Sequence, residues 1–151
     1  MKSTILSDYD NLVARVSALT PESARQWGSM TVSEMLVHLR KPISHSIYNN
    51  SSRDLSSLWS RTIIRFYLLH FLKQLPRGFK GPREVDMSKN GATMLSFEED
   101  KAKLLAAIAA FKQDTTENTG AIHPYFGAFD RMDWARFHYL HLDHHLRQFG
   151  V

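Results

Sequence analysis

The sequence contains no cysteine, and this absence removes several kinds of chemistry. Without thiols the chain can form no disulfide, supply no thiolate nucleophile and build no cysteine-ligated zinc or iron–sulfur site. Any metal must therefore be held by histidine, aspartate or glutamate. The eight histidines among 151 residues are then the main chemical resource of the chain.

Long apolar runs are also missing. Every stretch of eighteen residues contains a charged side chain, so we predict no transmembrane helix and no membrane partner. Asp8 and Asp10 lie where a secretory signal peptide would have a continuous apolar segment. We therefore expect a cytoplasmic protein.

Positive charge is in mild excess, with a formal net charge of +4. The basic residues are spread along the chain, with the densest group between Lys73 and Arg83. A nucleic-acid-binding protein would concentrate them on one face and carry a recognition motif, which we do not find, so we expect no nucleic-acid partner. Small anions are the better candidates, and Arg77, Lys80 and Arg83 could attract an anionic co-substrate.

The pattern of apolar residues predicts helices over most of the chain. Apolar side chains recur three and four positions apart over residues 5–19, 31–48, 96–118 and 130–149, and residues 55–75 are apolar nearly all round, as in a bundle helix. A helix lying on a membrane surface is the alternative for residues 55–75. Strand patterns are nearly absent, so we expect an all-α fold, an up-and-down four-helix bundle with short additional helices, in a single domain over residues 1–151.

Local signals mark where these helices begin. Thr31 with Glu34, and Ser96 with Glu99, have the spacing of capping boxes, and Asp130 can cap the last helix. The segment from Pro76 to Asn90 is rich in proline, glycine and charge without any period, and we expect a loop or lid there.

Histidines gather on one face of the predicted last helix. Trp134, His138, His141, His145 and Gln148 follow one another at spacings of four and three, so they form one stripe that should face the interior. A metal ion would satisfy several aligned imidazoles at once, whereas without one each ring must stay neutral and find its own partner. Three residues on the opposite side of the helix should face solvent: Arg136, Asp143 and Arg147.

Spacing alone leaves the choice of ligands open. His141 and His145 lie one turn apart and could reach the same ion, but His138 with His141, or His141 with His144, could also do so. The third ligand must come from another segment. Four histidines are candidates: His38, His45, His70 and His123.

His38 has a local feature that favours it. Pro42 lies four residues later and cannot donate the helical hydrogen bond to the carbonyl of His38, so a bend could aim this side chain into a site. Glu34 lies one turn before His38, where it could support a ligand or act as a base. Its place in the capping box is the simpler interpretation.

Three motifs together resemble a known group of proteins: Trp27-Gly28-x-Met30 followed by Met35-Leu36-x-His38, then His123-Pro124-x-Phe126-Gly127, then the segment from His141 to Phe149. They are similar to the DinB/YfiT-like superfamily, in a bacterial branch described as a domain of unknown function. The resemblance implies a four-helix bundle with a three-histidine metal site, formed by one histidine of the second helix and an HxxxH pair of the last. On this chain these residues are His38, His141 and His145, and the resemblance is what selects His145 over His144.

Characterised members of that superfamily include enzymes that use low-molecular-weight thiols and proteins described as metal-dependent hydrolases. The resemblance therefore implies a divalent-metal-dependent enzyme that activates water or a thiol for a small-molecule substrate. We expect zinc, with nickel, manganese or iron as alternatives. Two other hypotheses stay open, a non-catalytic metal-binding or stress-related protein and a bundle whose histidines only pack, and the chain could form a homodimer. Four residues could have a supporting or catalytic role that the sequence does not decide: Glu34, His123, His138 and His144.

Overall fold

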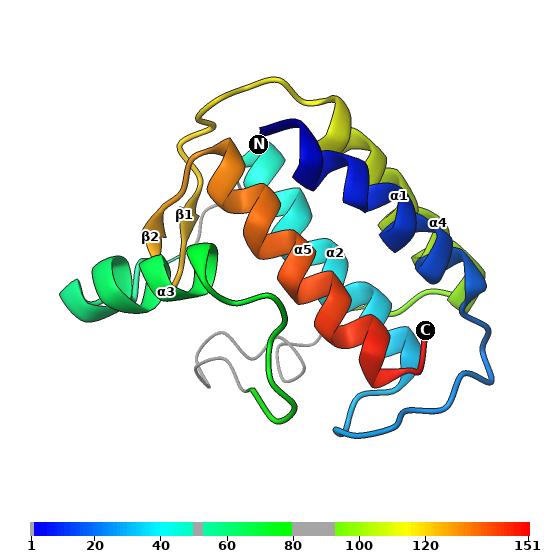
Figure 1. Cartoon of the computed structure of the whole chain (residues 1–151). Coiled ribbons are helices and arrows are strands. Elements are labelled where there is room, and N and C mark those ends of the chain that lie inside the picture. The colour runs from blue at the N-terminus through cyan, green and yellow to red at the C-terminus, as the bar shows by residue number, and fades with distance from the viewer. Residues whose placement is uncertain (1, 50–52, 80–92) are drawn as a thin grey trace.

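A computed structural model describes residues 2–49, 53–79 and 93–151, and these residues form a mostly helical, all-α protein. The helices are α1 (Lys2–Ala18), α2 (Val32–Tyr48), the short π-helix η1 (Ser60–Ile64), α3 (Arg65–His70), α4 (Phe97–Gln113) and α5 (Arg131–Gln148). A two-stranded antiparallel pair, β1 (Ile122–His123) and β2 (Gly127–Ala128), precedes α5 (Figure 1). The prediction of an all-α fold is confirmed, and this small hairpin is an addition to it.

The predicted helix starts are confirmed by their capping hydrogen bonds. Thr31 and Ser96 each exchange hydrogen bonds with a glutamate three residues later, and Asp130 does the same with Asp133. In the first box the Thr31 N–H donates to Glu34 Oε2 over 2.7 Å. These bonds satisfy N–H groups that the first turn of a helix leaves without partners.

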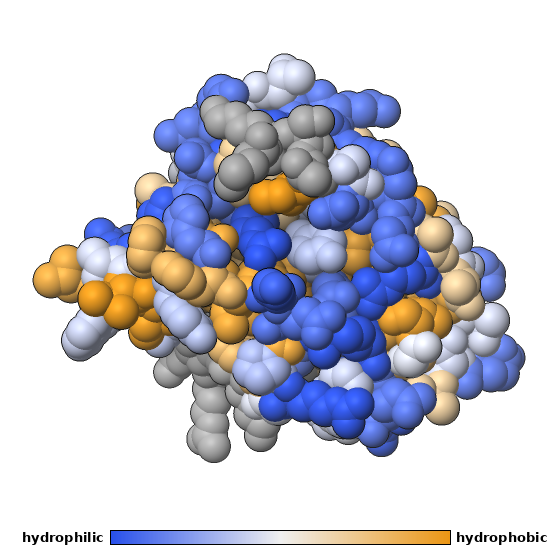
Figure 2. Space-filling view, in the orientation of Figure 1, coloured by the Kyte–Doolittle hydropathy of each residue, from blue (hydrophilic) through white to orange (hydrophobic). Residues whose placement is uncertain are grey.

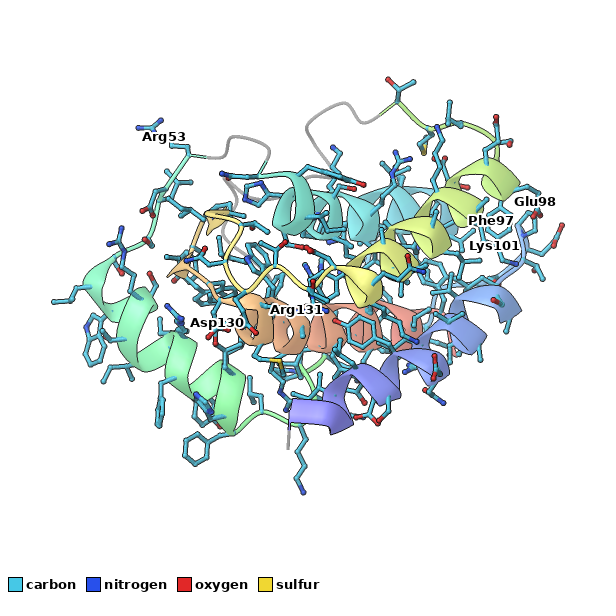
Figure 3. All side chains as sticks on the ribbon, turned by 90° about the horizontal axis from the view of Figure 1, so that it is seen from above. Arg53, Phe97, Glu98, Lys101, Asp130 and Arg131 are labelled. Carbon is cyan, nitrogen blue, oxygen red and sulfur yellow. The ribbon has the colours of Figure 1, made fainter. Side chains whose placement is uncertain are left out.

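Contacts near the helix ends fix the directions of the long helices. The Tyr9 hydroxyl donates to the carbonyl of Ala135 over 2.8 Å, and Arg15 lies beside Asp143, so α1 and α5 run in the same direction. Lys101, labelled in Figure 3 at the start of α4, donates to the carbonyl of Leu19 at the far end of α1. Helix α4 therefore runs opposite to α1.

Helix α2 runs opposite to α5. Ser46, near the end of α2, lies 2.9 Å from His138 near the start of α5, and the Gln26 N–H, before α2, donates to the carbonyl of Gln148 at the end of α5. It follows that α2 and α4, which pack against each other, run in the same direction. A strict up-and-down order would reverse one of them, so that part of the prediction is wrong: the end of α2 and the start of α4 lie at opposite ends of the bundle.

The segment from 55 to 75 is not a long bundle helix. Its regular part is η1 and α3, and it lies to one side of the long helices, against α5 and near the β1–β2 hairpin (Figure 1). Arg65 attaches it there by donating to the carbonyl of Ala128 over 2.7 Å and pairing with Asp133. Many of its large apolar side chains remain exposed.

Helix α5 contacts α1, α2 and α3, so little of it faces solvent. Asp143, which we expected at the surface, is buried between Arg15 at 2.9 Å and Arg147 at 2.8 Å. The expectation failed because α1 covers that side of α5. No described helix combines the length and the apolar character needed to cross a membrane.

Candidate metal centre

Three histidines from two helices converge between α2 and α5. His38 comes from the middle of α2, and His141 and His145 come from successive turns of α5. The Nε2 atoms of His38 and His141 are 2.9 Å apart, and one nitrogen from each of the three rings lies within 4.8 Å of the others. The three rings contact one another edge to face with centroids 4.8 Å apart in each pair.

Gln148 determines which nitrogen of His145 can bind. The Nδ1 atom of His145 lies 2.9 Å from Gln148 Oε1, and an amide oxygen only accepts, so the Nδ1–H of His145 must donate. The lone pair of this imidazole is therefore on Nε2. Gly28 leaves room for the amide: a Cβ atom there would lie 1.8 Å from Gln148 Nε2, so a larger residue would displace the side chain.

The surroundings of the cluster keep the rings of His141 and His145 neutral. Burial, followed by the neighbouring His38, lowers the pKa of His145 to about 3. The same two causes hold the pKa of His141 well below its usual range. Phe137 stacks on the His141 ring with centroids 5.5 Å apart and adds to its apolar surroundings. The imidazoles of His141 and His145 are thus in the unprotonated form that a metal ligand requires at neutral pH.

This donor set fits a divalent ion. Zinc takes neutral imidazoles at about 2.0–2.1 Å, which separates two tetrahedral ligand nitrogens by about 3.3 Å. In the structure the Nε2 atoms of His38 and His141 are 2.9 Å apart, and all three ligand nitrogens lie within 4.8 Å of one another. The separation that zinc requires lies between these two values. The second ring nitrogen of His145 is held by an acceptor, as is usual for metal-ligating histidines.

The other predicted candidates lie outside the cluster. His138 points from α5 toward Ser46, whose hydroxyl already donates to the carbonyl of Ile43, so the histidine donates to the serine. His45 donates to the carbonyl of Ile122 over 2.9 Å, and His70 is exposed beside Phe66.

His144 and His123 are also occupied elsewhere. The His144 ring is buried with an edge contact to Trp27, and this burial lowers its pKa. His123 lies in a group of aromatic rings, and its Nδ1 accepts hydrogen bonds from the backbone N–H groups of Tyr125 and Phe126. These bonds shape the turn between β1 and β2, so His123 supports the hairpin.

The charged candidates have structural partners or cannot be placed. The Glu34 carboxylate binds the Thr31 N–H in the capping box described above. Arg77 lies over the ring of Trp27 at 4.5 Å. Lys80 and Arg83 lie outside the described residues.

Sequence reasoning did not identify the relation between Gly28 and Gln148. Both residues were part of the motifs, and the i, i+3 spacing of His145 and Gln148 on one helix face was a usable signal for their hydrogen bond. The approach of Gly28 to Gln148 depends on how the segment before α2 packs on the end of α5. No local pattern encodes that contact.

Comparison with known proteins gives one family. The sequence model of the family described as "Protein of unknown function (DUF1569)" matches residues 2–150. No curated protein and no solved structure matches the chain.

Proposed function

The chain belongs to the DUF1569 family, and from this premise we propose that it is a divalent-metal-dependent enzyme built on a DinB/YfiT-like four-helix bundle. In this proposal His38, His141 and His145 hold the ion, and zinc is the expected metal. The reaction is activation of water or of a low-molecular-weight thiol, as in a hydrolase or a thiol transferase. The family itself is described without a function.

The observation that carries the proposal is the convergence of three imidazole nitrogens within 4.8 Å. A neutral imidazole has one N–H, and His145 uses its N–H on Gln148, so its lone pair is left for the cluster. Lone pairs brought together in a buried place repel one another unless a proton or a cation lies between them. One shared proton can join only His38 and His141, whereas an ion would join all three.

The residues around the cluster have separable tasks. The three histidines would bind, Gln148 keeps the proton of His145 on Nδ1, and Phe137 holds the plane of the His141 ring. With three neutral ligands and an open position, a bound divalent ion would supply Lewis acidity toward water or a thiol. His145 is buried and His38 and His141 are partly buried, which limits the access of bulk water to their nitrogens.

A non-catalytic metal-binding protein is the second candidate, and one observation favours it. Among the residues that the structure describes, the cluster of candidate ligands consists of three histidines only, and the nearest carboxylate along α2, that of Glu34, is committed to the helix cap. A metal-dependent enzyme needs a group that moves a proton. If the chain supplies no such group, the substrate or a thiol would have to transfer the proton.

Metal content of purified variants tests the site. We expect about one equivalent of divalent metal in the wild type and in His144→Ala, and loss of stoichiometric metal in His38→Ala, His141→Ala and His145→Ala. His144→Ala is the matched control because it removes a buried imidazole from the adjacent position of α5. Full metal retention by His145→Ala would contradict the assignment.

A second experiment separates the enzyme from the binding protein. Cobalt is loaded in place of the native metal and a low-molecular-weight thiol is titrated in. An exchangeable coordination position changes the visible spectrum as thiol binds, which supports the enzyme. A spectrum that does not respond to thiol or to small anions supports the non-catalytic protein.

A further inference from the structure

The segment that carries η1 and α3 exposes an unusual amount of apolar surface. We call six of its residues the α3 face: Leu58, Trp59, Ile63, Phe66, Tyr67 and Phe71. Their exposed fractions run from 56% for Tyr67 to 81% for Leu58. The apolar colour gathers at this edge of the molecule in Figure 2, and many side chains of the segment point away from the long helices in Figure 3.

The area of the α3 face suits a protein interface. At roughly 200 Å² per aromatic side chain, exposed fractions near 60% leave about 500 Å² on its four aromatic residues alone. This is at the upper end of the largest apolar patch of a typical monomer, about 300–600 Å². Two copies meeting through this face would bury on the order of 1,000 Å², the lower limit for a specific interface.

The chemistry of the α3 face suits a second copy of the same chain. In a two-fold dimer each face meets itself, so any charge on it would meet a like charge. None of its six members is charged, and two arginines of the segment have partners within the chain: Arg61 binds Asp54, and Arg65 binds Asp133 and the carbonyl of Ala128. Aromatic residues, which dominate this face, are enriched at protein interfaces.

The same two arginines argue against a membrane surface as the occupant. A helix that lies on an anionic bilayer uses Lys and Arg on its polar side to bind lipid phosphates. In this segment Arg61 and Arg65 are paired with carboxylates of the chain itself, so lipid phosphates would have to compete with Asp54 and Asp133 for them.

The rings of the α3 face are arranged before any partner binds. Tyr67 and Phe71 stack with centroids 6.0 Å apart and planes 13° apart, and Phe66 meets Phe71 edge to face. Side chains that are already ordered lose less conformational entropy on association. We propose that the α3 face is the interface of a homodimer.

Sedimentation velocity of the full chain from about 1 to 100 µM tests this proposal. The wild type is expected at twice its 17.4 kDa, and the double variant Trp59→Glu, Phe66→Glu at 17.4 kDa, with association weakened by at least 100-fold. The matched control is Tyr48→Glu, which places the same charge on an exposed aromatic residue outside the face and should stay dimeric. Circular dichroism melts of all three show whether each variant is folded.

Two results would overturn the proposal. One is a monomeric wild type over the whole concentration range, and the other is a double variant that stays dimeric while folded. Vesicles of phosphatidylglycerol and phosphatidylcholine are included as a third arm. A monomer that sediments with these vesicles, and loses this in the double variant, would assign the α3 face to a membrane instead.

Discussion

The free energy of unfolding at low pH tests how the buried His123 contributes to the stability of the fold. His123 is 7% exposed, and its Nδ1 accepts from the N–H groups of Tyr125 and Phe126 over 3.1 and 3.2 Å. Burial, with a smaller effect from His45, lowers its pKa to about 3. The folded protein therefore holds this ring neutral at a pH where a free histidine is charged.

The sign and size of the effect follow from linkage. An unfolded chain protonates this histidine below about pH 6.5, while the folded chain leaves it neutral down to its own pKa of about 3. Between these values the unfolded state binds more protons, so stability falls as pH falls. With 1.36 kcal/mol per pH unit, His123 alone should lower the free energy of unfolding by about 2 kcal/mol at pH 5 compared with neutral pH.

His123→Asn isolates this contribution. The Asn Oδ1 can take the place of Nδ1 as acceptor for the two N–H groups, while the amide does not titrate. The variant should be less stable by about 1–3 kcal/mol at pH 7.5, because a smaller side chain leaves a void among the rings. This deficit should shrink by about 2 kcal/mol at pH 5.

Urea unfolding at pH 7.5, 6 and 5 measures the free energy of unfolding of the wild type and of His123→Asn. A chelator is present so that metal does not contribute. Phe129→Leu is the matched control: its ring lies 5.1 Å from that of His123, and its removal leaves a void without removing a titrating group. Its deficit should not change with pH. A deficit of His123→Asn that is equally constant would refute the reasoning.

Three further predictions rest on single contacts. Gln148→Met removes the acceptor of the His145 Nδ1–H and should weaken metal affinity by about 10- to 100-fold in a chelator competition, so unchanged affinity would contradict the tautomer argument. Asp143→Asn removes a buried charge bound by two arginines and should cost about 1–3 kcal/mol in urea unfolding, and a loss below about 0.5 kcal/mol would mean that the pair is solvated. Tyr9→Phe leaves the Ala135 carbonyl without its donor and should cost about 1–2 kcal/mol, whereas a neutral result would imply that water replaces the hydroxyl.

The helix starts could be predicted because their chemistry is local. Thr31, Ser96 and Asp130 each satisfy N–H groups within three residues, so neighbouring residues decide the outcome. The order of helix directions could not be predicted in this way. The apolar pattern of a helix shows which face is buried and does not show which helix covers it.

The candidate site was predictable in part. Helical spacing placed His138, His141 and His145 on one face. It could not show which two of them converge on the third histidine from α2. His138 leaves the cluster because Ser46 lies opposite it, about two turns along α2 from His38. Contacts between α2 and α5 therefore decide which histidines join the cluster. The choice of His38 and His145 came from the resemblance of the motifs.

The candidate site joins two helices that lie far apart in the sequence. His38 and His141 are separated by 103 positions, so a ligand that joins them closes a loop of about two thirds of the chain. In a protein without cysteines, such a ligand would act as a reversible cross-link between the second helix and the last. By the chain-entropy argument used for disulfides, closing a loop of about 100 residues stabilises the folded state by up to about 4.7 kcal/mol. The cell's supply of metal would then control how long this protein survives proteolysis as well as what it can bind.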